Sequence, residues 1–100
     1  MMQLRLKIWM PDDFGGGFMP FHGFFLDVAV DYASAAAMEE VLDAMPGVLA
    51  LVDGPCRRYE TYDDVGSTLK KVLSAAGLEA YLPTLANVGG RANIEIELLD

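Results

Sequence analysis

The sequence predicts an α+β fold in which two helices pack on one face of a mainly antiparallel sheet. Three segments, residues 2–10, 24–32 and 92–99, alternate apolar and polar residues with the period of a half-buried strand. Two further segments place apolar residues three and four positions apart, which is typical of helices. With 100 residues and 53% hydrophobic content, the chain is expected to form a single compact domain over residues 1–100.

The first two alternating segments are consecutive and are expected to pair as antiparallel strands. Opposite charges and aromatic pairs favour a register in which Trp9 faces Phe25 and Lys7 faces Asp27. A slip of one strand by one residue would place apolar side chains opposite charged ones, so it is disfavoured. The pattern therefore predicts both the pairing and its register, in which the numbers of paired residues sum to 34, as for Trp9 and Phe25.

A long Phe/Gly-rich loop over residues 11–23 connects these two strands. All five phenylalanines of the chain fall between Phe14 and Phe25, around a glycine triplet at 15–17. Loops of this length are often functional. Burying each phenylalanine stabilises the fold by roughly 1.5–3 kcal/mol, so leaving several of them exposed is costly. Two arrangements of the loop remain open. The loop folds over the core, or its aromatic side chains join Trp9 in an exposed patch of the kind that binds proteins.

The middle of the chain predicts a helix followed by a hairpin. Ser34 is expected to cap the helix, and residues 46–47, Pro-Gly, end it. The uninterrupted apolar run 48–52 predicts a buried strand, and the tyrosine-rich segment 57–62 predicts its hairpin partner. The apolar stripe of the helix is expected to comprise Ala35, Met38, Val41, Leu42 and Met45.

The C-terminal third predicts a second helix over 65–76, capped by Asp63 or Asp64, then a short strand near 79–82 and a terminal strand. From the second strand onward this is the ferredoxin-like β-α-β-β-α-β order, preceded by an extra N-terminal strand. The extra strand is expected beside the last one, because its two cations would then lie between acidic residues on both sides. These residues are Arg5 and Lys7 between Asp27 and Asp31 on one strand and Glu95 and Glu97 on the other.

Composition and charge limit the classes of partner. The formal net charge of −8 opposes direct binding to nucleic-acid phosphates and favours a partner with a basic surface. The longest apolar runs are far shorter than the roughly 20 residues of a membrane span. The N-terminus lacks the apolar region of a signal peptide, so a cytoplasmic protein without membrane contact is expected.

The sequence carries no recognisable catalytic constellation. The glycine triplet lacks the lysine and the following helix of a phosphate loop. His22 and Cys56, the single histidine and cysteine, show no spacing that would bring them together, and one cysteine forms neither an intrachain disulfide nor a cysteine-rich zinc site. The paired acids are better explained as helix caps and solvated faces. We therefore expect no enzyme, no metal site and no cofactor.

The leading functional hypothesis is a small acidic protein-binding module that blocks or scaffolds a larger partner. Phage-encoded inhibitors of bacterial defence nucleases, some of which mimic nucleic acid, have a similar profile of size and charge. The alternative is an oligomeric regulatory or small-ligand-binding ferredoxin-like domain, with a homodimer formed through the sheet face or an edge strand. The candidate partner-binding residues are Trp9, Phe14, Phe18, Phe21, Phe25, Glu39, Glu40 and Asp43.

Overall fold

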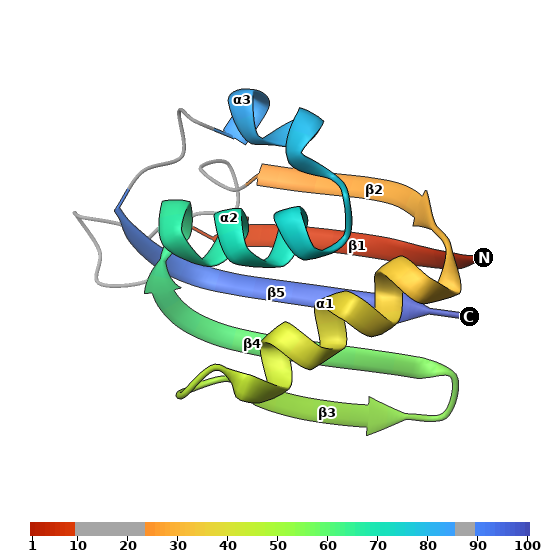
Figure 1. Ribbon diagram of the computed structural model, residues 1–100. Coiled ribbons are helices and arrows are strands. Elements are labelled where there is room, and N and C mark those ends of the chain that lie inside the picture. The colour runs from red at the N-terminus through yellow and green to blue at the C-terminus, as the bar shows by residue number, and fades with distance from the viewer. Residues whose placement is uncertain (10–23, 86–89) are drawn as a thin grey trace.

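A five-stranded antiparallel sheet forms the centre of the molecule, and its helices lie on one face, as the sequence predicts (Figure 1). The computed structural model describes residues 1–9, 24–85 and 90–100. The elements are β1 (Met2–Trp9), β2 (Phe24–Val30), α1 (Tyr32–Ala44), β3 (Leu49–Asp53), β4 (Cys56–Asp64), α2 (Val65–Ala75), the 3-10 helix η2 (Glu79–Tyr81), α3 (Leu82–Leu85) and β5 (Arg91–Leu99).

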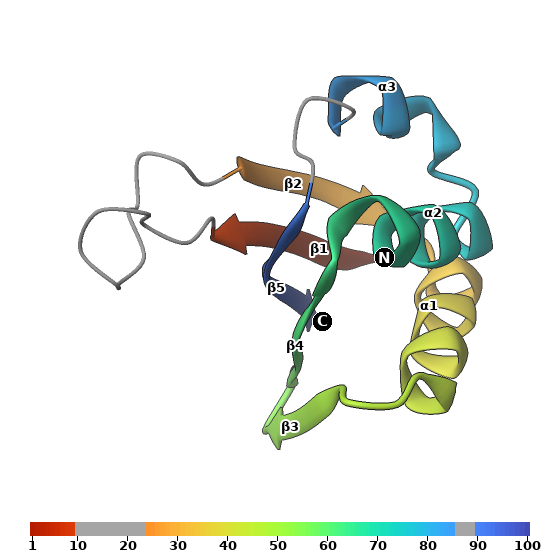
Figure 2. The same cartoon turned by 90° about the vertical axis from the view of Figure 1, so that its left-hand side faces the viewer.

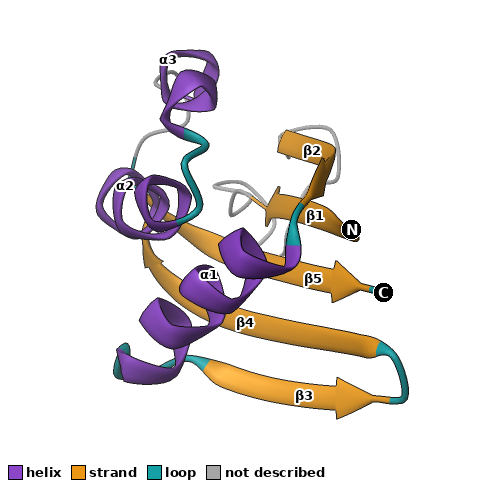
Figure 3. Cartoon of the chain, turned by 45° about the vertical axis from the view of Figure 1, so that its right-hand side comes forward, coloured by secondary structure: helices purple, strands orange, loops and turns teal. Residues whose placement is uncertain are grey.

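The spatial order of the strands differs from that of a ferredoxin-like sheet. The order along the chain matches the prediction, but in space the strands follow β2-β1-β5-β4-β3. Strands β2 and β3 therefore occupy opposite edges and run in the same direction, and α1 crosses the face of the sheet between them (Figure 3). A ferredoxin-like split β-α-β unit would leave one strand between them, whereas three lie there. The reason is that β1 pairs with both β2 and β5, which separates those two strands.

Strand β1 lies beside β5, as its charges predict, but its register with β2 differs from the predicted one by two residues. Arg5 faces Asp27 and Lys7 faces Phe25, so paired positions sum to 32. A slip of two residues keeps every side chain on its own face, so the alternation of apolar and polar residues does not distinguish the two registers. The observed register also places Arg5 and Lys7 opposite Glu97 and Glu95 of β5.

The cap of α1 lies earlier than predicted. Asp31 is the N-cap, and its carboxylate accepts a hydrogen bond from the backbone N–H of Ser34 at 2.7 Å. Ser34 therefore donates the N–H that the cap satisfies, because a capping side chain accepts from the N–H two or three positions further on. The helix ends at Ala44, and the Pro46-Gly47 sequence follows, with Gly47 at φ +81°.

The second helix begins as predicted, with Asp64 accepting a hydrogen bond from the N–H of Ser67 at 3.2 Å. The neighbouring Asp63 accepts from the hydroxyl of the buried Thr68 at 3.1 Å. The strand predicted near 79–82 is wrong, since this segment forms η2 and the start of α3. A proline at position 83 suits the first turn of a helix, where its missing N–H costs no hydrogen bond.

The hydrophobic core lies between the helices and one face of the central strands. Alternate residues of β1 and β5 are fully buried against α1 and α2, as the two-residue period predicts. Figure 2 shows the helices on one side of the sheet. The core strands contribute Leu4, Leu6, Ile8, Ala92, Ile94, Ile96 and Leu98, and the helices contribute Ala35, Met38, Leu42, Val65, Leu69, Val72 and Leu73.

Strand β3 is exposed along its whole length, so the prediction of a buried strand is wrong. It pairs only with β4 among the described residues and forms one edge of the sheet. The two-residue loop Gly54-Pro55 joins β3 to β4, with Gly54 at φ +58°, as expected for the first central position of a type II′ turn. Burial within the single chain therefore does not explain why this run is apolar.

Candidate functional site

The face of the sheet opposite the helices is the candidate site. Among the residues that the structure describes, no helix lies on this face (Figure 2). Its side chains come from the positions that alternate with the core, and they form ion pairs across β2, β1, β5 and β4. We call this surface the uncovered face.

The ion pairs of the uncovered face begin at the β2 side. The Nε of Arg5 lies 3.4 Å from a carboxylate oxygen of Asp27, which is its direct cross-strand partner. The Nζ of Lys7 lies 3.4 Å from Glu97 and 3.6 Å from Glu95. Arg5 therefore lies between Asp27 of β2 and Glu97 of β5, as predicted, and Lys7 meets the acids of β5. The prediction that Asp31 also flanks these cations is wrong, because Asp31 follows β2 and caps α1.

Arg58 of β4 completes the network. Its guanidinium lies 2.6 Å from a carboxylate oxygen of Glu95, 3.4 Å from Glu60 and 3.6 Å from Glu97. Three carboxylates thus share two cations, Arg58 and Lys7. Glu95 and Glu97 are largely buried, at 14% and 13% exposure, whereas Glu60 is 42% exposed. The network carries one negative charge in excess, and Glu60 is the most solvent-exposed of these three glutamates.

The pKa of Glu95 reflects this arrangement. Burial alone raises the pKa of the Glu95 carboxyl, since it disfavours the charged form. The hydrogen bonds from Arg58, together with the positive charges of Arg58 and Lys7, outweigh burial and leave the pKa of Glu95 lowered. The carboxylate is therefore ionised at neutral pH.

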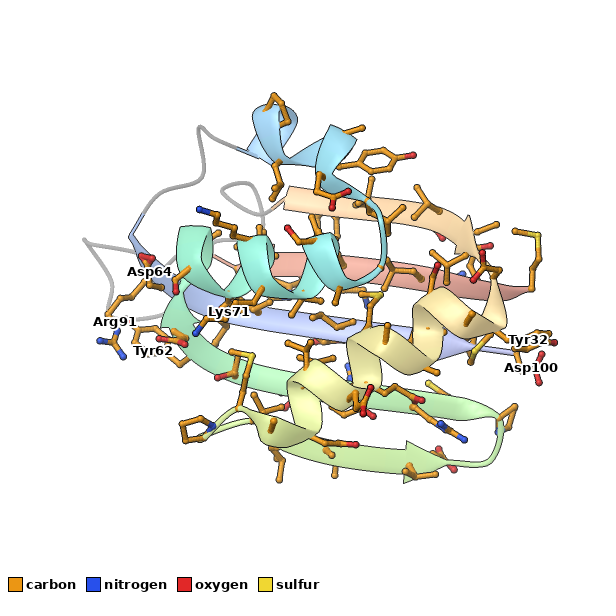
Figure 4. The ribbon with its side chains drawn as sticks, viewed as in Figure 1. Tyr32, Tyr62, Asp64, Lys71, Arg91 and Asp100 are labelled. Carbon is orange, nitrogen blue, oxygen red and sulfur yellow. The ribbon has the colours of Figure 1, made fainter. Side chains whose placement is uncertain are left out.

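Aromatic side chains form a row across one end of the uncovered face. The rings of Trp9 and Phe25 meet edge to face, with centroids 5.2 Å apart. Asn93 of β5 pairs with both Trp9 of β1 and Tyr62 of β4, so the row continues across three strands. The guanidinium carbon of Arg91 lies 5.7 Å from the centre of the Tyr62 ring, and the two side chains are adjacent in Figure 4. Phe25 and Tyr62 are 54% and 50% exposed.

A shallow hollow of about 140 Å³ lies where the aromatic row meets the ion-pair network. Trp9, Glu60, Asn93 and Glu95 contribute to its lining. Aromatic rings attract cations through their faces, and carboxylates accept charge-assisted hydrogen bonds. The hollow thus combines two groups that suit a lysine or arginine side chain.

The helical face carries a second polar cluster, which joins α1 to β4. Arg57 donates to both carboxylate oxygens of Glu39, at 2.7 Å and 2.6 Å, and the Tyr59 hydroxyl donates to the same carboxylate at 3.4 Å. Burial, and next the negative charges of Glu39 and Asp43, raise the pKa of Tyr59 to about 12. This cluster fastens the helix to the sheet.

A cleft of about 290 Å³ lies at the end of the molecule that carries both termini. The Tyr32 hydroxyl donates to Asp100 at 2.7 Å beside it, as Figure 4 shows. Arg57 and Glu39 line the cleft as well, and they are bound to one another. The polar side chains of the cleft thus bind one another and connect α1 with β4 and with the C-terminus. We therefore assign them a structural role.

The structure separates the residues that the sequence proposes for partner binding. Trp9 and Phe25 lie together on the uncovered face. Glu39 is engaged by Arg57 and Tyr59, whereas Glu40 and Asp43 are exposed on α1. Phe14, Phe18, Phe21 and His22 lie outside the described residues, and Cys56 is partly buried on β4.

Sequence reasoning missed Tyr62, Asn93 and Glu60 as members of the site. The signal was present in the alternation of β4 and β5, which places these side chains on the same face as Arg58 and Glu95. Pairing of β4 with β5 was needed to bring them together, because they lie about 30 residues apart along the chain.

Comparisons with protein-family models, curated protein sequences and solved structures found no match to this chain. The described ranges contain no group of three or more histidine, cysteine or acidic side chains placed to hold a metal ion. Nor does any helix within them have the length and apolar character required to cross a membrane.

Proposed function

We propose that this protein is a small acidic protein-binding module that blocks or scaffolds a larger partner, and that it binds through the aromatic end of the uncovered face. The observation that carries the proposal is the row of Phe25, Trp9 and Tyr62 beside an ion-pair network with one negative charge in excess. Exposed tyrosine, tryptophan and phenylalanine side chains surrounded by polar residues are typical of protein interfaces.

The chemistry of the partner follows from the hollow beside Trp9. A basic side chain of the partner would neutralise Glu60 and contact the tryptophan ring. Such a contact agrees with the net charge of −8, which steers the chain towards a basic surface. The module is thus expected to bind an arginine or lysine at the centre of its contact surface.

The same face is poorly suited to a nucleic-acid backbone. Binding phosphates requires cations that are free to replace counterions. Each of the four cations on this face has a carboxylate within 4.0 Å: Arg5 with Asp27, Lys7 with Glu97, Arg58 with Glu95, and Arg91 with Asp63. We therefore propose a protein partner without direct nucleic-acid binding.

The test begins with affinity capture from lysate of the source cells and continues with the purified partner. Phe25→Ser and Tyr62→Ser are expected to weaken binding at least tenfold, about 1.4 kcal/mol each. Glu60→Gln should weaken binding and reduce its salt dependence, because it removes the excess charge.

Glu79→Gln serves as the matched control, since it removes the same charge from an exposed position on η2, away from the candidate partner-binding residues. Binding unchanged by all three substitutions on the uncovered face would refute the proposed surface. Failure of the wild-type chain to retain any stoichiometric partner would refute the binding function itself.

A further inference from the structure

Strand β3 combines a sequence typical of burial with a position that leaves it exposed. Residues 48–52 form an uninterrupted apolar run, as in strands covered on both faces. In the folded chain, Leu49, Leu51 and Val52 are 56%, 44% and 75% exposed. The strand also carries neither the lysine nor the proline that usually protects an open sheet edge from pairing.

The same run reads identically in both directions: Val48-Leu49-Ala50-Leu51-Val52. An antiparallel strand of the same sequence, centred on Ala50, would place Ala50 opposite Ala50 of the second copy and Leu49 opposite its Leu51. Each position from 48 to 52 then meets an apolar side chain of matching type. This register also keeps side chains on their proper faces, because paired positions differ by an even number.

We infer that β3 pairs with β3 of a second copy of this chain, forming a symmetric dimer with a continuous ten-stranded sheet built from the two five-stranded ones. The interface is isologous, so it closes after two copies and does not propagate. The pairing supplies hydrogen-bond partners to the open edge and covers the exposed leucines and valine.

Charge favours a second copy at this edge over other parts of the surface. Each chain carries −8, so two copies repel one another at most approaches. Residues 48–52 are uncharged, and in this register Asp53 lies opposite Gly47 of the second copy, where it meets no acid. The opposite edge, β2, presents the exposed Asp27, which is unfavourable for pairing with another acidic chain.

The experiment measures the mass of the full chain in solution by analytical ultracentrifugation. The wild type is expected to approach twice its 10.9 kDa mass as concentration rises through the micromolar range. Added salt should strengthen the dimer, because it screens repulsion between two acidic chains. Ala50→Lys places two lysines directly opposite each other and should weaken dimerisation at least tenfold, as should Ala50→Glu.

An equimolar mixture of the A50K and A50E variants, each shown to be folded by circular dichroism, restores the dimer if position 50 faces itself. Ala29→Lys on β2 is the matched control, since it makes the same change at an exposed position of the other edge strand. The inference is overturned by a wild type that stays monomeric, by a mixture that stays monomeric, or by a dimer that A29K disrupts and A50K does not.

Because the aromatic row is not part of β3, Phe25→Ser and Tyr62→Ser leave the dimer intact, which separates this result from the proposed partner binding.

Discussion

Arg57 on β4 holds Glu39 on α1 through both carboxylate oxygens, at 2.7 Å and 2.6 Å from a single guanidinium nitrogen. The two residues lie 18 positions apart in the sequence and come from different layers of the fold. This bond fixes α1 to β4, the strand next to the edge strand β3. It also converts an acid that the sequence proposes for partner binding into a structural group.

The coupling between these two residues is the first prediction. In a double-mutant cycle with Arg57→Met and Glu39→Gln, the double variant should be more stable than the sum of the single changes implies, because each single change leaves one charge without its partner. Urea unfolding of the four proteins measures the coupling. The exposed pair Arg5–Asp27 provides the control cycle, with a smaller coupling expected since it lies in solvent on both sides. Equal couplings in the two cycles would contradict the structural role.

Alkaline pH should destabilise the protein through Tyr59. Its pKa is raised to about 12 by burial and by nearby Glu39 and Asp43, from the ordinary value of 10.0. The folded state therefore retains the proton, so the stabilisation is complete below pH 10 and is lost as pH rises towards 12. Tyr59→Phe should make the urea midpoint less dependent on pH in this window.

Tyr32 also contributes to the loss of stability at alkaline pH, since its hydrogen bond to Asp100 raises the pKa of its hydroxyl. Tyr32→Phe should therefore remove a further part of the dependence of stability on alkaline pH.

For Tyr59, a contradictory result would be a Tyr59→Phe variant whose urea midpoint depends on pH between pH 10 and pH 12 as steeply as that of the wild type. It would show that Tyr59 is more accessible than the structure indicates.

The cap of α1 yields a prediction at acidic pH. The N–H of Ser34 bonds the Asp31 carboxylate and lowers its pKa below 3.8. The stabilisation from this charge is present above the ordinary pKa and is lost as pH falls through the lowered value. Asp31→Asn keeps a capping oxygen, so it should lower the melting temperature at pH 7 less than Asp31→Ala and also remove part of the acid dependence.

Ser34→Ala distinguishes this structure from the cap that the sequence alone suggested. The larger contribution of Ser34 to Asp31 is its backbone N–H, which alanine retains, and only the smaller contribution of its hydroxyl is lost. The melting temperature of the Ser34→Ala variant should therefore stay near that of the wild type, whereas Asp31→Ala should lower the melting temperature. The reverse order, measured by circular dichroism, would support the cap at Ser34.

Two leucines that differ in burial should respond differently to truncation to alanine. Leu6 on β1 is 1% exposed at the centre of the core, so Leu6→Ala should reduce the free energy of unfolding by about 2–5 kcal/mol. Leu51 is 44% exposed on β3, and its truncation should cost less than about 1 kcal/mol in the monomer, where little apolar surface is lost from burial. Urea denaturation at low protein concentration compares them, and equal losses would contradict an exposed β3.

The local patterns of the sequence determined most of the elements. Period-two alternation located β1, β2 and β5, and helical spacing located α1 and α2, because each pattern follows from geometry that neighbouring residues share. The charges of Arg5 and Lys7 were sufficient to place β1 beside β5, since both cations needed acidic neighbours. Period-two alternation also assigned Trp9 and Phe25 correctly to the same face of the sheet.

The tertiary structure decided what depends on distant partners. The register of β1 with β2 was decided by contacts such as Arg5 with Asp27, because a two-residue slip preserves the local pattern. The exposure of β3 was decided by its place at the edge of the sheet, since an apolar run indicates burial without saying which surface covers it. The meeting of Trp9, Asn93 and Tyr62 required three strands that are far apart in the sequence, and only their pairing placed an aromatic row beside an ion-pair network with one negative charge in excess.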